Sequence, residues 1–212
     1  MDTGSARPTF PLLTIWFQPR LTIRRIVDTD SQKYVNFLAA LTGISNGLDT
    51  ASRRSSGDIF PFPLVLIMVI IFGSIGGWIS LYISGALLRW TGSWFGGQAN
   101  SDEVRAAVAW ASIPTCAGLA IWILEIAIFG QELFTESAPR IDNSLFLSLL
   151  LLALLIPQLI LGLWSLVLLI NTLAEVHRFS GWKAFGAATS AFLIIFIPLL
   201  CLVFIAIGFG GG

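Results

Sequence analysis

Charge is scarce in this sequence. Only 11% of its 212 residues are Asp, Glu, Lys or Arg, against about 25% in a typical soluble domain. The formal net charge is zero and the basic residues form no single stripe, so a nucleic-acid partner is not expected. Apolar residues fill the chain instead, with 56% hydrophobic residues and a mean hydropathy of +0.84. This composition excludes an ordinary soluble domain and indicates a membrane protein.

Side chains that usually carry chemistry are also few. There is one histidine, and the two cysteines, Cys116 and Cys201, lie in apolar segments without a Cys-x-x-Cys pair. This context predicts buried packing thiols rather than a metal site. The segment 92–97 has the glycine spacing of a phosphate-binding loop, but Gln and Ala follow it where Lys and Ser or Thr are needed. The sequence therefore predicts no enzyme, no catalytic residue, no cofactor and no metal site.

Long apolar segments alternate with short charged loops. The clearest, residues 144–171, has no charged side chain, and Gln158 is its one strongly polar residue before Asn171. About 20 apolar residues suffice to cross a ~30 Å hydrocarbon core as a helix. The other expected spans are residues 34–48, 61–88, 104–129 and 184–207. The first is short, and its alternative is a re-entrant segment. We expect an all-α membrane protein, a five-transmembrane-helix bundle in one domain over residues 34–212.

An amphipathic helix is expected before the first span. Within residues 15–33, Ile23 and Ile26 share one face, while Arg20, Arg24 and Arg25 crowd the remaining surface. The pattern predicts an interfacial helix lying on the bilayer, with these arginines at the membrane surface. Residues 1–33 are thus expected to form a cytoplasmic N-terminal tail that is retained, since no signal-peptide cleavage site is present.

The distribution of basic residues orients the chain. Five spans put nine basic residues on the side of the N-terminus and three on the other, whereas four spans give eight against four. Basic loops stay in the cytoplasm, so both counts predict a cytoplasmic N-terminus. Five spans, the more lopsided division, put the C-terminus outside.

Small residues on the second span predict close helix packing. Gly76, Ser80 and Ser84 repeat every fourth position, and Gly73 and Gly77 form a G-x-x-x-G pattern beside them. Small side chains let helix backbones approach closely in lipid. The alternatives are packing within the chain and contact with a second copy.

Glu125 is the one acidic residue well within a clear span. Charged groups in lipid are costly and suggest function by default. Because Glu125 lies four residues from Phe129 at the end of its helix, three roles stay open: contact with headgroups, a bond to a polar neighbour such as Arg140, or a place on an ion pathway.

A second polar group, Asn171, Glu175 and His177, lies at the cytoplasmic end of the fourth span. Its single histidine is too few ligands for zinc, so an interfacial polar cluster is expected.

Several motifs resemble those of the Yip domain family (Ypt-interacting proteins), in its prokaryotic integral membrane form. They are Trp16-x-x-Pro19-Arg20, Ser84-Gly-Ala-Leu-Leu88, Ala106-Ala-x-Ala-Trp-Ala-Ser-Ile-Pro114 and Trp164-x(6)-Asn171-Thr-Leu-Ala-Glu-x-His177. The resemblance covers roughly residues 16–207 and implies five helices, a cytoplasmic N-terminus and the prokaryotic inner membrane. Eukaryotic members are associated with Rab-type GTPases. This chain has only about 33 residues before the membrane and no Asp-Leu-Tyr-Gly-Pro motif, so GTPase binding is not implied.

Two functions follow as hypotheses. The first is a non-enzymatic Yip-type protein that organises or partners other membrane components, with the lipid bilayer, a membrane protein or a second copy as partners. The alternative is a small transporter or channel subunit that uses Glu125 as an intramembrane carboxylate.

The charge count makes the topology testable. Compartment reporters fused at Gly57, Gly97, Ser137, Ser180 and Gly212 should alternate in location, because each pair of neighbouring sites is separated by one expected span. A cytoplasmic signal at Gly212 would contradict five crossings and demote residues 34–48 to a surface or re-entrant segment.

Overall fold

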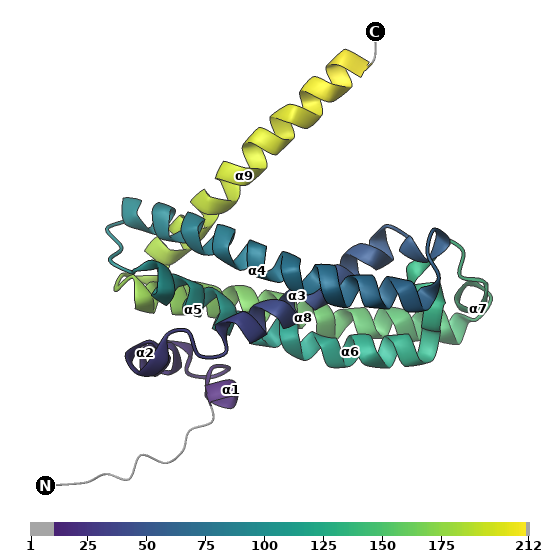
Figure 1. Cartoon of the computed structure of the whole chain (residues 1–212), viewed down its shortest axis with the longest axis horizontal. Helices are drawn as coiled ribbons and strands as arrows, with labels where there is room; N and C mark the ends of the chain where they lie inside the picture. Colours follow the sequence, from purple (N-terminus) through teal and green to yellow (C-terminus); the bar gives the residue numbers. More distant parts are fainter. Residues whose placement is uncertain (1–10, 211–212) are drawn as a thin grey trace, which may run out of the picture.

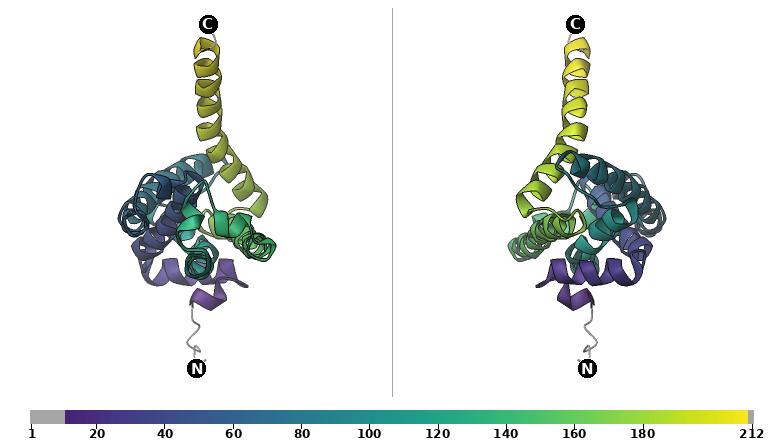
Figure 2. Two further views of the ribbon diagram at one scale, coloured as in Figure 1. Left: turned by 90° about the vertical axis from the view of Figure 1, so that its right-hand side faces the viewer. Right: turned by 90° about the vertical axis from the view of Figure 1, so that its left-hand side faces the viewer.

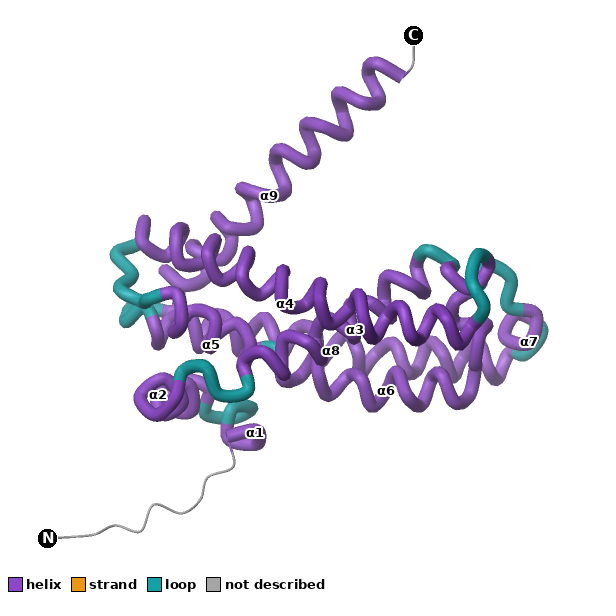
Figure 3. The backbone as a smooth tube through the Cα atoms, viewed as in Figure 1, coloured by secondary structure: helices purple, strands orange, loops and turns teal. Residues whose placement is uncertain are grey.

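The chain is helical throughout the part that its computed structural model describes, which is the backbone of residues 11–210 with side chains through residue 202. Residues 1–10 of the expected tail and Gly212 lie outside this range. Figure 1 shows a bundle elongated along α4, α6 and α8, and Figure 3 shows its loops gathered at the two ends. The elements in chain order are α1 (Pro11–Thr14), α2 (Pro19–Asp30), α3 (Val35–Arg53), the 3₁₀ helix η1 (Ser56–Asp58), α4 (Phe62–Trp94), α5 (Ser101–Ala111), α6 (Ile113–Phe129), the 3₁₀ helix η2 (Gly130–Phe134), α7 (Pro139–Asp142), α8 (Leu145–Val176) and α9 (Gly181–Gly210).

The two ends of the bundle are built differently. One end carries α2, the start of α5 and the junction between α8 and α9 (Figure 1). The other carries η1, η2 and α7, and it is tied by Asp58, whose carboxylate accepts the backbone N–H of Glu136 at 3.0 Å. α2 lies across the bundle axis, as it is seen nearly end-on in Figure 1 and from the side in Figure 2. An interfacial helix requires this orientation.

Four helical stretches of the described chain are long and apolar enough to cross a membrane: Phe62–Trp94, Ser101–Phe134, Leu145–Val176 and Gly181–Leu202. They correspond to the expected second to fifth spans, which confirms a multi-pass helical protein. The expected first span, residues 34–48, is not among them. Its helix, α3, continues to Arg53 and so includes Asp49 beyond the apolar stretch. The five-helix count therefore stays a prediction.

Local sequence explains where these helices begin and break. The side chain of Asn100 accepts hydrogen bonds from the backbone N–H groups of Asp102 and Glu103, and the carboxylate of Glu103 accepts the backbone N–H of Asn100, which completes a capping box at the start of α5. The expected span 104–129 is two helices, because Pro114 lacks an N–H and clashes with the preceding turn. Ser112 stands at the break. Ser144 caps α8 by accepting the N–H of Leu147 at 3.3 Å.

The backbones of α3 and α4 approach each other closely through their glycines. Gly43 faces Gly73 and Gly77 so closely that a Cβ at Gly43 would overlap the carbonyl oxygen of Gly73, and one at Gly77 would overlap that of Ala39. A Cβ at Gly73 would lie 2.9 Å from the carbonyl oxygen of Gly43. The G-x-x-x-G pattern on α4 therefore packs within the chain.

α9 leaves the bundle. Its first turns are held by Ala184, Ala187 and Ala191, which are buried. From Phe192 to Leu202 no side chain is buried, and both Figure 1 and Figure 2 show this part of α9 projecting away from the other helices. Cys201, expected as a buried packing thiol, is exposed here, whereas Cys116 on α6 is half-buried.

The α3–α4 contact predicts different effects of substitution at two neighbouring glycines. Gly77→Leu should destabilise the protein by about 1–3 kcal/mol or prevent its accumulation, because a side chain must force the two backbones apart. Gly76→Leu, one residue away with nothing within 4 Å of an added Cβ, should leave stability unchanged. The unfolding midpoints of the two variants in detergent provide the comparison, and equal losses would contradict the packing described.

Candidate functional site

The small-residue stripe of α4 borders a groove of about 590 Å³ between α3, α4 and η1, which Gly73, Gly76, Gly77 and Ser80 all line. Gly73 and Gly77 also contact α3, whereas Gly76 and Ser80 are exposed. Ser84 is half-buried, and its hydroxyl donates to the carbonyl of Ser80 at 2.6 Å. The opposite wall of the groove includes Asn46, Gly47 and Thr50 of α3, and Met68 lies further along α4. We call this surface the α3–α4 groove.

Glu125 faces the interior of the bundle. Its side chain is only 4% exposed, and one carboxylate oxygen accepts a hydrogen bond from Nε2 of Gln158 on α8 at 2.8 Å. The suggested partner, Arg140, is not involved. Glu125 also lines a cavity of about 570 Å³ near the η2–α7 end of the bundle. The structure therefore shows Glu125 in an interhelical hydrogen bond beside a cavity. The expected contact with headgroups is wrong, because the side chain is buried.

Other polar contacts join the same helices. Thr115 of α6 and Ser165 of α8 are 2.9 Å apart at their hydroxyls. Thr42 of α3 donates to the hydroxyl of Ser112 at 2.7 Å, at the break between α5 and α6. Such side-chain pairs hold helices together where lipid offers no alternative partner.

The arginines of α2 meet the polar cluster at the end of α8. Arg20 donates to the side-chain oxygen of Asn171 at 3.1 Å, and Arg24 forms an ion pair with Glu175 at 3.0 Å. The face of α2 that carries Ile23 and Ile26 is buried in the protein, so acyl chains do not cover it. Arg25 is exposed on the same helix. Contact of the three arginines with the membrane surface stays a prediction. Arg20 and Arg24 also make the internal contacts described above.

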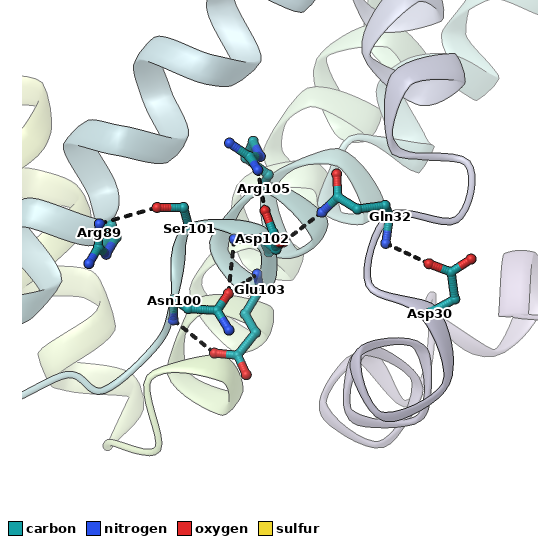
Figure 4. Close-up of polar contacts among 8 residues, drawn as sticks. All are labelled: Asp30, Gln32, Arg89, Asn100, Ser101, Asp102, Glu103 and Arg105. Atoms are coloured by element: carbon teal, nitrogen blue, oxygen red, sulfur yellow. Dashed lines mark hydrogen bonds and ion pairs between the residues drawn. The ribbon is translucent and has the colours of Figure 1, made fainter.

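A further polar network fixes the segment between α2 and α3 to the start of α5 (Figure 4). The amide of Gln32 donates to the backbone carbonyl of Asp102 at 3.4 Å, and its backbone N–H donates to Asp30 at 3.0 Å. Arg105 pairs with Asp102, while Arg89 of α4 donates to Ser101 at 3.2 Å. The N-terminal segment is thus linked to α5 and α8 at one end of the bundle.

His177 follows α8 and is packed beneath the glycine-rich loop. Its side chain is 1% exposed and stacks on Phe179 with ring centres 5.0 Å apart. A Cβ at Gly92 would lie 2.5 Å from Nε2 of the imidazole, and a Cβ at Gly97 would overlap Nδ1. The glycines of the segment 92–97, which imitate a phosphate-binding loop, therefore make room for the histidine.

Burial also governs how His177 titrates. Neither ring nitrogen has a hydrogen-bond partner of ordinary geometry. Desolvation lowers the pKa of His177 below its usual 6.5, and the Leu88 backbone and the charge of Glu103 oppose this effect. The imidazole is neutral in the folded protein at pH 7.

Three important residues were missed from sequence. Gly43 and Gly47 form a second G-x-x-x-G pattern in the weak first span, and Asp49 lies at the cavity that contains Glu125. The glycine spacing was a usable signal. Asp49 lies just beyond the expected first span, residues 34–48, because an acidic residue usually marks the end of an apolar stretch.

Comparison with known proteins identifies the family. The Yip1 domain family matches residues 13–203, which is most of the chain. The chain belongs to the Yip1 domain family. No curated protein and no solved structure matches it. The Yip1 domain family is not a known enzyme family, and together with the four apolar helical stretches this match makes the protein an integral membrane protein.

The neutral, buried imidazole predicts a pH dependence of stability in this Yip1 domain protein. The unfolded chain binds a proton near pH 6.5 and the folded chain only at lower pH, so the stability that the neutral ring contributes is present above pH 6.5 and is lost as the pH falls below it. One proton gives at most about 1.4 kcal/mol per pH unit. Unfolding midpoints between pH 7.5 and 5.0 should fall more steeply for the natural protein than for His177→Gln. Equal slopes would show that other groups control the acid sensitivity.

Proposed function

We propose that this Yip1 domain protein is a non-enzymatic membrane scaffold that assembles with other membrane-spanning segments through the α3–α4 groove. A second copy is the partner that the chain itself suggests, with α9 of one copy lying in the groove of the other. The groove with its open Gly76 carries this proposal, because small residues facing outward in a membrane helix are the usual site of helix association.

The proposed topology has five crossings, a cytoplasmic N-terminus and an external C-terminus, in a prokaryotic inner membrane. The course of α3 supports it, since α3 begins after α2 at one end and leads to η1 at the other (Figure 1). The charges support it as well: of the described basic residues, eight belong to the end that carries α2 and three, Arg53, Arg54 and Arg140, belong to the η1–α7 end. In this topology α2 rests on the cytoplasmic leaflet.

α9 supplies a surface that matches the groove. Between Phe192 and Leu202 it presents mostly exposed apolar side chains, such as Ile195, which is 55% exposed. A groove floor of glycine lets such a ridge approach the backbone. Both surfaces gain contacts by meeting, whereas each alone packs only against lipid.

The depths of the two surfaces also agree. Met68 lies six residues, or about 9 Å, from the external end of α4. Cys201 lies 20 residues, or about 30 Å, from the cytoplasmic start of α9. When α9 lies along α4 of the partner copy across a hydrocarbon core of ~30 Å, both side chains fall in the outer half of the bilayer.

This agreement allows a cross-linking test. Met68→Cys in a Cys116→Ser background should form a disulfide with the natural Cys201 of a second copy when membranes are oxidised, and run as a covalent dimer without reductant. Ile67→Cys, which lies one residue away, is 53% exposed and does not line the groove, is the matched control. A dimer of equal yield from both variants, or from neither, would contradict a second copy in the groove.

The same dimer should weaken when the groove is filled. Gly76→Leu combined with Met68→Cys should lower the yield of covalent dimer severalfold while the protein accumulates normally, because the leucine occupies the space that α9 requires.

The alternative function, a small transporter or channel subunit, is favoured by one observation. Glu125 faces the bundle and a cavity, which is the orientation a coupling carboxylate needs and a headgroup contact does not.

A further inference from the structure

The cavity beside Glu125 lies between the ends of α3 and α6 and the start of α8, and η2 and α7 close it. Its volume is about 570 Å³. An adjoining cavity of about 210 Å³ shares Asp49, Trp122 and Gln158 with it. We call the two together the outer cavity. Pockets of roughly 300–1,000 Å³ with mostly apolar walls and a few convergent polar groups are typical of small-molecule sites.

Negative charge prevails in the walls. Of the described residues, four acidic side chains and one basic side chain, Arg53, line the larger cavity. Glu132 already accepts the backbone N–H groups of Arg140 and Ile141, at 3.2 and 3.1 Å, and so caps α7. Three carboxylates remain for a ligand, those of Asp49, Glu125 and Asp142.

Glu125 is the group that most requires a partner. Only 4% of its side chain is exposed. The neutral amide of Gln158 is its hydrogen-bond partner, and within the described part of the chain it forms no ion pair. A buried carboxylate without a neighbouring cation is costly in free energy. It therefore binds either a proton or a cation from outside the chain.

The remaining walls indicate the kind of cation. Trp122, Leu151 and Leu155 offer an apolar surface, and the ring of Trp122 stacks on Phe134 with centres 6.2 Å apart. Such a surface suits an apolar or aromatic substituent carried by the cation. No group of three His, Cys, Asp or Glu side chains is placed to hold a metal ion among the residues described.

We propose that the outer cavity binds a monovalent organic cation, an ammonium group with an apolar substituent. The ammonium would lie at Glu125 and Gln158, and the substituent against Trp122 and the leucines. This inference rests on neither of the two proposed functions, since it requires binding alone. A scaffold could carry the site as readily as a transporter could.

Benzylammonium is a suitable probe because it joins one positive charge to one aromatic ring. The full-length protein in lipid nanodiscs should bind it in calorimetry at pH 7.5, with a rise in the unfolding midpoint. Benzyl alcohol, the neutral relative, and sodium chloride at equal ionic strength should each have at most a tenth of the effect. Equal stabilisation by benzyl alcohol would mean that apolar filling suffices, and equal stabilisation by sodium would mean an inorganic cation; either result overturns the proposal.

Two variants locate the site. Glu125→Gln keeps the size of the side chain and should weaken benzylammonium binding at least tenfold without lowering the midpoint of the free protein. Glu136→Gln removes an exposed carboxylate outside the cavity and should bind as the natural protein does. If Glu125→Gln does not accumulate, Asp49→Asn takes its place with the same expectation. Unchanged binding in the cavity variant would overturn the proposal, as would loss of binding in Glu136→Gln.

Discussion

The close approach of α3 to α4 is the contact on which the rest of this structure depends. Gly43 on one helix and Gly73 and Gly77 on the other bring the two backbones together without side chains between them. α3 is not among the described helical stretches apolar enough to span alone, and two of its hydroxyl groups find partners on other elements in this position. Thr42 reaches Ser112, and Ser52 donates to the carbonyl of Leu133 at 2.7 Å. The same placement leaves the α3–α4 groove on one side of α3 and brings Asp49 to the outer cavity on the other.

The two ends of the bundle differ in how completely their polar groups are paired. At the end that carries α2, ion pairs, a capping box and the network of Figure 4 connect the helices, and the imidazole of His177 fills the space under the loop. At the other end a cavity separates the helices, and carboxylates line it. One end thus fixes the arrangement of the helices, and the other provides space for a ligand.

Sequence patterns predicted the long helices well, because an apolar stretch of sufficient length has few other structures available in a membrane. They failed where tertiary contacts decide. The break at Ser112 depends on Pro114 together with the hydrogen bond from Thr42. The length of α3 depends on the cavity at its end, which has room for the side chain of Asp49. Burial of Ile23 on the protein-facing side of α2 was not predictable either, because amphipathicity is the same for a helix that packs on lipid and one that packs on protein. The orientation of Glu125 was not predictable without the position of Gln158. Helical periodicity shows which residues share a face of a helix, but not which helix that face contacts.

The contacts of α2 with α8 have a consequence for synthesis. Arg20 and Arg24 each bind a residue 151 positions later in the chain. Ribosomes add roughly 5–20 residues per second, and the N-terminal part of a chain emerges first. The apolar side chains of Ile23 and Ile26 on α2 therefore stay uncovered for many seconds, until α8 has been synthesised and inserted. An amphipathic helix in this state can bind the nearby bilayer surface. The membrane can therefore cover the apolar face of α2 until the completed bundle buries it.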